Sequence, residues 1–151
     1  MRGIPSPDTA VIWPMLHPIP VAHLDAAWPH VEAMLEAATA TSRGRETAFD
    51  IRRAVRAEDA QLWLWWDDSR RKATAVAVTQ IVLHPRKKAC RIRIVTGEDM
   101  GAWLDQGLAE LEAWARSLGC ELMEANARPG WGRVMKGRGY QVGHHFIERE
   151  L

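Results

Sequence analysis

Apolar residues recur every three or four positions along residues 103–118. The repeating set is Trp103, Leu104, Gly107, Leu108, Leu111, Trp114, Ala115 and Leu118. Charged residues of the same stretch fall on the opposite side, so the pattern predicts an amphipathic helix with its apolar face against a core. Gly119 follows directly and predicts the left-handed residue that ends such a helix.

Shorter elements are predicted on both sides of this helix. Residues 90–96 alternate, which predicts a strand with Cys90, Ile92 and Ile94 inward and Arg91 and Arg93 outward. After the helix the chain predicts a strand over residues 120–125, a turn over 128–132 and a second helix over 133–137. A last strand is expected from residue 140 to about 149. The order strand, helix, strand, helix, strand forms the predicted architectural core.

The first half of the chain predicts two helices. Residues 23–40 carry apolar positions at helical spacing, and Pro29 is expected in the first turn with Trp28 near the cap. Thr47 lies three residues before Asp50, which predicts a capping box at the start of the second helix.

Two further strands precede residue 90. Residues 61–66 are apolar at both alternating sets of positions, which predicts a central strand covered on both faces. Residues 72–83 predict a long strand, in which Val76 and Val78 face opposite to Ala75 and Ala77. Three antiparallel strands and a crossover helix make a mixed sheet, so the expected class is α+β with helices on both faces.

The prolines divide the chain. Residues 1–22 hold five of the eight prolines, which predicts an extended arm that includes a short edge strand at residues 11–13. An alternative is an arm that docks on a partner through Trp13, Met15 and Leu16. Residues 23–151 have the length of a single domain.

Composition excludes several functional classes. The net charge of +1 provides no global field for a nucleic acid, and no apolar run is long enough to cross a membrane. Cys90 and Cys120 lack the spacing of a metal or redox motif, and two free thiols indicate a reducing compartment such as the cytoplasm. Eight tryptophans indicate a bulky core or adhesive surfaces.

The element order resembles the second half of the GNAT family of acetyltransferases. The matching stretches are residues 91–95, 103–118 and 121–125 and the pair Gly139-Tyr140. In this resemblance Tyr140 corresponds to a structural aromatic. Residues 111–120 and 128–136 are also similar to small GNAT-like proteins of tailed phages. The resemblance implies a GNAT-like fold over residues 23–151 and, more narrowly, a virion protein of the tail or head–tail region.

The coenzyme motif of the family is altered here. The family places glycines between a strand and the long helix so that backbone N–H groups receive a pyrophosphate. Residues 96–102 contain Gly97 and Gly101 at a different spacing and lack the leading Gln or Arg. Glu98 and Asp99 are expected in the first helical turn, where they would satisfy the helix dipole and repel a diphosphate.

The catalytic positions of the family are altered as well. The tyrosine that protonates the departing thiolate corresponds to Met135, which has no proton to donate. Glu124 or His84 remains as a base. No catalytic residue and no metal ligand are assigned, and the cofactor-binding candidates are Gly97, Gly101, Arg128, Arg133 and Lys136.

Basic and aromatic residues supply candidates for partner binding. They are Trp13, Arg86, Lys87, Lys88, Arg91, Arg93 and Trp131. The basic members are expected to form one zone with residues 70–72 at adjacent hairpin ends. Arg128, Arg133, Lys136 and Arg138 beside Trp131 would suit phosphate and a stacked base, but a solvated helix face is the default interpretation.

Three functional hypotheses follow. The first is a non-catalytic GNAT-fold interaction module of a phage virion, without a cofactor, whose partners are other virion proteins or a second copy of the chain. The alternative is a divergent N-acetyltransferase that uses acetyl-CoA. A nucleic-acid-binding accessory is a third, weaker hypothesis.

Overall fold

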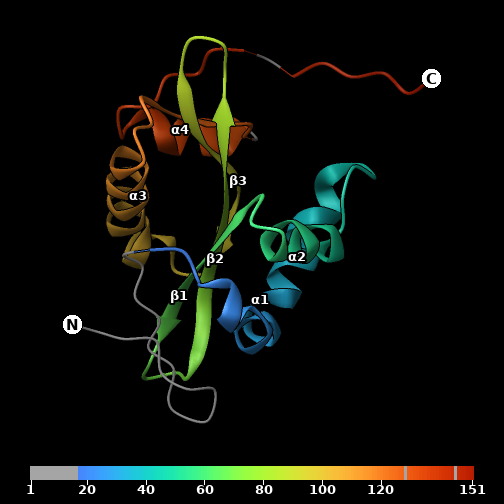
Figure 1. The fold of residues 1–151 in the computed structure, drawn as a ribbon, viewed down its shortest axis with the longest axis vertical. Coiled ribbons are helices and arrows are strands. Elements are labelled where there is room, and N and C mark those ends of the chain that lie inside the picture. The colour runs from blue at the N-terminus through green and yellow to red at the C-terminus, as the bar shows by residue number, and fades with distance from the viewer. Residues whose placement is uncertain (1–16, 128, 145) are drawn as a thin grey trace.

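A four-stranded sheet separates two pairs of helices in the computed structural model, which describes residues 17–127, 129–144 and 146–151 (Figure 1). Trp13 and Arg128, both named as candidates, and the strand expected at residues 11–13 lie outside the described residues. The elements are η1 (Val21–His23), α1 (Leu24–Thr39), η2 (Ala40–Ser42), α2 (Ala48–Arg56), β1 (Gln61–Asp67), β2 (Lys72–Leu83), β3 (Lys88–Gly97), α3 (Met100–Ser117), β4 (Leu122–Ala125) and α4 (Pro129–Lys136).

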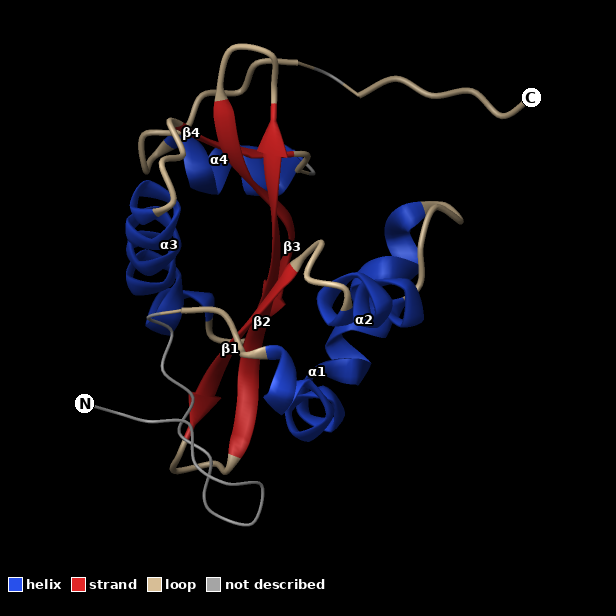
Figure 2. Ribbon diagram, viewed as in Figure 1, coloured by secondary structure: helices blue, strands red, loops and turns tan. Residues whose placement is uncertain are grey.

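The sheet has the order β1-β2-β3-β4 (Figure 2). The first three strands are antiparallel, and α3 crosses over to β4, which pairs parallel to β3. This confirms the predicted mixed sheet. Gly119 follows α3 with a φ of +80°, so it ends the helix as predicted.

Each face of the sheet carries its own apolar cluster. Val76 and Val78 pack with α1 and α2, whereas Ala75 and Ala77 pack with α3 on the other face, as the alternation of β2 predicts. Strand β1 is also covered on both faces, but within the described residues it forms the edge of the sheet, so the prediction of a central position is wrong. The chain before α1 meets this edge at Ile19, whose N–H donates to the carbonyl oxygen of Leu62 at 2.8 Å.

A bulge in β3 overturns one sequence-based expectation. Val78 pairs with Ile94, but the next residue of β2 pairs with Ile92, so Arg93 is an extra residue in the ladder. The extra residue reverses the alternation. Ile92 therefore joins the cluster around α3 while Ile94 packs against the cluster around α1, and the two do not share one inward face as predicted.

The helix starts are partly as predicted. Thr47 and Asp50 form the expected capping box, with Thr47 N donating to Asp50 Oδ2 at 2.9 Å. Pro29, however, lies inside α1, which begins at Leu24. The missing N–H of Pro29 costs one hydrogen bond, and the burial of Leu24 and Trp28 stabilises the first turn nonetheless.

The turn expected over residues 128–132 is replaced by the start of α4 at Pro129. Proline suits the first helical position because its fixed φ is helical and its N–H is not needed there. None of the described helices has the length and apolar character that crossing a membrane requires.

The strand expected from residue 140 to about 149 does not form in the described part of that segment. Val142, Phe146 and Ile147 are exposed. Glu148 instead forms ion pairs with Arg43, at 2.6 Å, and with Arg45, both in the loop before α2. Contacts to this loop take the place of a sheet ladder.

Gly107 allows α3 to approach the sheet closely, because a Cβ at this position would collide with the Trp65 indole, 2.8 Å from Cε2. We expect Gly107→Ala to lower the free energy of unfolding by about 1–3 kcal/mol, despite the better helix propensity of alanine. Gly101→Ala is the matched control, since a Cβ there meets nothing within 4 Å. Its expected effect lies between zero and a stabilisation of about 1 kcal/mol. Equal denaturant midpoints for the two variants would contradict this packing account.

Candidate functional site

Strands β3 and β4 separate halfway along β3. They pair in parallel from Ala89 opposite Leu122 to Ile92 opposite Ala125. Strand β3 then continues to Gly97, and over this half its described strand partner is β2 alone. The side of β3 that faces β4 thus presents backbone N–H and C=O groups for another extended molecule.

The N-terminus of α3 lies at the end of this open half. Asp99 precedes the helix with a φ of +54° and makes no side-chain hydrogen bond to the helix. Gly101, in the first turn, has open space around it. A helix start without a side-chain cap presents N–H groups and a partial positive charge.

The carboxylates of Glu98 and Asp99, next to this helix start, form ion pairs with basic residues of the β1–β2 hairpin. Arg70 binds both, at 2.9 Å from Glu98 and 3.2 Å from Asp99. Lys72 lies 2.6 Å from Glu98. Both residues precede α3, whose first turn holds no acidic residue, and Asp99 does not cap it, so the expectation that they lie in the first turn and satisfy its donors is wrong. Two cations offset their charge, which also weakens the predicted repulsion of a diphosphate.

Gly97 has a structural reason to be glycine. A Cβ there would collide with the carbonyl oxygen of Thr74 and lie 2.5 Å from the Cβ of Ala75. The neighbouring N–H, that of Glu98, donates to the same Thr74 oxygen at 2.9 Å. Close packing of β2 and β3 thus accounts for Gly97, whereas the open surroundings of Gly101 leave space for a ligand.

An apolar slot lies between β3, α3 and α4. Its lining residues are Trp65, Ile92, Val95, Trp103, Leu104, Leu108, Leu111 and Met135. The slot has a volume of about 10 Å³, too small for an acyl chain. Met135 lines it with a flexible thioether that can repack.

A polar cluster lies on the opposite face of the sheet, one residue before β3 and β4 separate. His84 Nε2 is 2.5 Å from Glu124 Oε1, and Arg91 donates to Glu124 Oε2 at 3.2 Å. Partial burial raises the pKa of Glu124, but the hydrogen bonds from His84 and Arg91 outweigh it and lower the pKa overall. A charged Glu124 can hold the His84 ring in a fixed orientation.

The lowered pKa of Glu124 makes its contribution to stability depend on pH. A carboxyl group with a lower pKa in the folded state stabilises the protein above its unfolded-state pKa, near 4.5, and this stabilisation is lost as the pH falls through the folded-state value. We expect Glu124→Gln to be less stable than the wild type at pH 7 and to approach it below about pH 4. Urea unfolding at several pH values measures this. Glu36→Gln on α1 controls for loss of one exposed carboxylate, and a constant deficit down to pH 3 would contradict the assignment.

The predicted basic zone is not continuous. Arg91 pairs with Glu124 and Arg93 with Glu46, and the Lys88 ammonium donates to the carbonyl of Leu118. Arg86 and Lys87 remain exposed at the β2–β3 turn. Residues 70–72 lie at the other end of β2, roughly 35 Å away along the strand, so the two groups are not adjacent as expected.

The α4 candidates have different surroundings. Arg133 and Lys136 are exposed, but Trp131 packs against the apolar cluster around α3. Tyr140 packs against the same cluster, as its family position implies, and its hydroxyl donates to Glu112 at 2.9 Å. Burial raises the pKa of Tyr140, and Glu112 raises it further, so the phenol stays protonated.

A search with protein-family models and a search of curated protein sequences give no match. Solved structures, in contrast, are similar over most of the chain. A probable acetyltransferase aligns with a TM-score of 0.65 and 12% identity over 89% of this chain and 95% of that chain. An acetyltransferase of Trypanosoma brucei aligns with a TM-score of 0.62 and 13% identity over 89% of this chain and 97% of that chain. Glucosamine-6-phosphate N-acetyltransferase from Arabidopsis thaliana aligns with a TM-score of 0.61 and 16% identity over 89% of this chain and 95% of that chain.

These similarities confirm the predicted GNAT-like α+β fold. Identities this low carry no activity with them, so the function has to be argued from the site.

Proposed function

We propose that the protein is an acyl-CoA-dependent N-acyltransferase, which moves an acyl group from a coenzyme A thioester to an amine. The observation that supports it most is the separation of β3 from β4 beside a helix start without a side-chain cap. The three acetyltransferases with the same fold also favour this activity.

The chain offers groups that suit both halves of the coenzyme. Acyl-CoA carries amides along its arm, which can pair with the open edge of β3 between Arg93 and Gly97. Its diphosphate suits the first turn of α3, where Gly101 leaves room and the dipole favours an anion. Arg70 pairs with Glu98 and Asp99, and Lys72 pairs with Glu98, so cations offset the negative charge beside that turn.

His84 is the proposed general base. A thioester in the opening between β3 and β4 would lie close to Glu124, which holds the His84 ring. The amine nitrogen attacks the thioester carbonyl, the C–N bond forms, and the C–S bond breaks. His84 accepts the proton that the amine loses, and Glu124 stabilises the resulting charge.

Met135 does not prevent this reaction, although it donates no proton. A thiol has a pKa near 8.5, so the thiolate of coenzyme A leaves without an acid. Protonation by water follows.

A second candidate is the non-catalytic interaction module, which Met135 and the closed slot favour. Its placement in a phage virion rests on the sequence resemblance of residues 111–120 and 128–136, while the three compared structures are acetyltransferases. The two candidates differ in whether the protein releases coenzyme A in the presence of an amine.

The release of free thiol from acetyl-CoA, assayed with a panel of primary amines, tests the proposal. We expect release that depends on the amine, above the rate of hydrolysis. Arg70→Ala should raise the KM for acetyl-CoA roughly tenfold, because Glu98 and Asp99 lose their partner beside the helix start. Arg71→Ala is the matched control, since Arg71 pairs with Asp68. Thiol release that no amine accelerates would favour the interaction module.

A further inference from the structure

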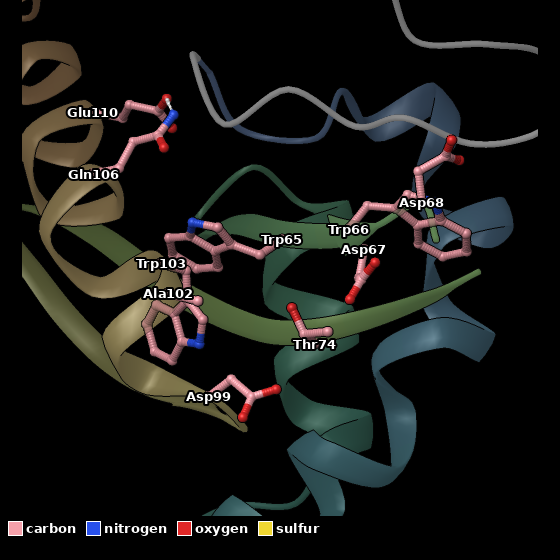
Figure 3. Close-up of a pocket in the computed structure, with 10 residues that line it drawn as sticks. All are labelled: Trp65, Trp66, Asp67, Asp68, Thr74, Asp99, Ala102, Trp103, Gln106 and Glu110. Carbon is pink, nitrogen blue, oxygen red and sulfur yellow. Dashed lines mark hydrogen bonds between the residues drawn. The ribbon is translucent and has the colours of Figure 1, made fainter. Parts of the chain in front are cut away.

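A cavity of about 350 Å³ lies between the end of β1, the start of β2 and the first turns of α3 (Figure 3). We name it the tryptophan–carboxylate pocket, after the indoles of Trp65, Trp66 and Trp103 and the carboxylates of Asp67 and Asp99 in its wall. Its volume falls in the range of small-molecule sites. We propose that this pocket binds an alkylammonium group that also carries a hydroxyl or carbonyl oxygen. This proposal is independent of the acyl transfer.

The charge of the pocket selects a cation. None of its described lining residues is basic. Asp99 and Asp68 each pair with an arginine, at 3.2 and 3.4 Å. Asp67 differs, because its oxygen accepts from the N–H and hydroxyl of Ser69 and from the N–H of Arg70. These hydrogen-bond donors are neutral groups, and the positive charge of Arg70 acts on Asp67 less than the hydrogen bonds do.

The indoles add a second reason for a cation. Trp65 and Trp103 pack with their ring centroids 5.0 Å apart and an angle of 41° between the planes. Tryptophan is the side chain that attracts cations most strongly through its ring face. Aromatic rings combined with carboxylates therefore suit an ammonium group better than a neutral or anionic one.

Unpaired indole N–H groups in the pocket wall are the reason for a hydroxyl or carbonyl oxygen on the proposed ligand. The Nε1 atoms of Trp65 and Trp66 are buried, and neither has a hydrogen-bond partner among the described residues. An indole nitrogen can only donate, and a buried donor without an acceptor is costly. A hydroxyl or carbonyl oxygen on the ligand would satisfy one of them. In Figure 3 the side chains of Gln106 and Glu110 extend from α3 on the side of the pocket where the Trp65 indole lies.

The pocket is separate from the proposed general base, although it borders the first turn of α3, where the diphosphate is proposed to bind. It shares Trp65 and Trp103 with the apolar slot, so these two rings form the wall between them. His84 and Glu124 lie on the opposite face of the sheet. The two proposals can therefore fail independently.

Three small probes test the two features of the ligand. Choline has the charge and the hydroxyl, tetramethylammonium lacks the hydroxyl, and 3,3-dimethylbutan-1-ol lacks the charge. Binding is followed through the indole N–H signals in ¹H–¹⁵N NMR spectra, assigned with single Trp→Phe variants. We expect choline to shift the signals of Trp65 and Trp66 and to leave that of Trp28, which donates to Glu32, unchanged. Tetramethylammonium should bind several-fold more weakly, and the neutral alcohol at least about tenfold more weakly.

Asp67→Asn removes the charge but keeps an oxygen that can accept in the turn. We expect about tenfold weaker choline binding for this variant and no change for Asp59→Asn, an exposed site that controls for net charge. Nα-acetyl-lysine methylamide, as a competitor, distinguishes a lysine side chain from a free amino alcohol as the natural source. Equal binding of the neutral alcohol, unchanged choline affinity in Asp67→Asn, or no indole shift at tens of millimolar probe would overturn the proposal.

Discussion

Replacing His84 by glutamine is expected to lower the turnover number for acyl transfer by roughly a hundredfold to ten-thousandfold, the range that a general base contributes. Glutamine can still donate to Glu124, which lies 2.5 Å from the histidine ring in the wild type, but it accepts no proton from the amine. The proposed coenzyme contacts, the edge of β3 and the first turn of α3, do not include His84, so the dissociation constant of acetyl-CoA should stay the same.

His144→Gln is the matched control, because His144 is exposed in the segment after α4. Added imidazole should restore part of the activity of His84→Gln if the missing group is a base. A fall in coenzyme affinity equal to the fall in turnover would indicate a structural role. Unchanged turnover would remove His84 from the mechanism.

Gly97→Ala is expected to cause the largest loss of stability among the glycine substitutions. The added Cβ would collide with the backbone oxygen of Thr74 and with Ala75, 2.5 Å from its Cβ. Backbone atoms in a paired strand cannot rotate away, as the end of a flexible side chain can. We expect the free energy of unfolding to fall by about 3 kcal/mol or more, which lowers the melting temperature by about 10 °C.

Thermal unfolding measures this effect, and Gly143→Ala serves as the control because a Cβ there meets nothing within 4 Å. At a temperature where Gly97→Ala is fully folded, its affinity for acetyl-CoA should remain within about threefold of the wild type. A stable variant that has lost coenzyme binding would show that Gly97 contacts the coenzyme directly, as the sequence-based candidate list proposed.

Periodicity in the sequence was enough to predict most of the fold. The spacing of Trp103 to Leu118 predicts α3, the alternation of Val76 and Ala77 predicts β2, and Thr47 predicts the start of α2. In each case the signal is local, because the side chains that decide the structure are a few residues apart. Three antiparallel strands followed by a crossover helix predict a mixed sheet, which the structure confirms, whereas the central position predicted for residues 61–66 is wrong.

Features that depend on distant partners could not be predicted. The bulge at Arg93 arises from the register with β2, and Glu98 pairs with Arg70, which lies 28 residues earlier in the turn between β1 and β2. Each of His84 and Glu124 is a possible base in the sequence, but their pairing across 40 residues appears only in the fold. The tryptophan–carboxylate pocket could not be predicted from the sequence for the same reason, since the run Trp65 to Asp68 indicates only a strand and a turn.

The account depends most on acyl-CoA binding where β3 leaves β4, at the start of α3. Isothermal titration of the protein with acetyl-CoA tests this directly, with Gly101→Asp as a variant that places a carboxylate in the open space of the first turn. We predict one site per chain with a dissociation constant in the micromolar range and at least tenfold weaker binding to Gly101→Asp. No binding at millimolar acetyl-CoA, or equal affinity for both proteins, would contradict it.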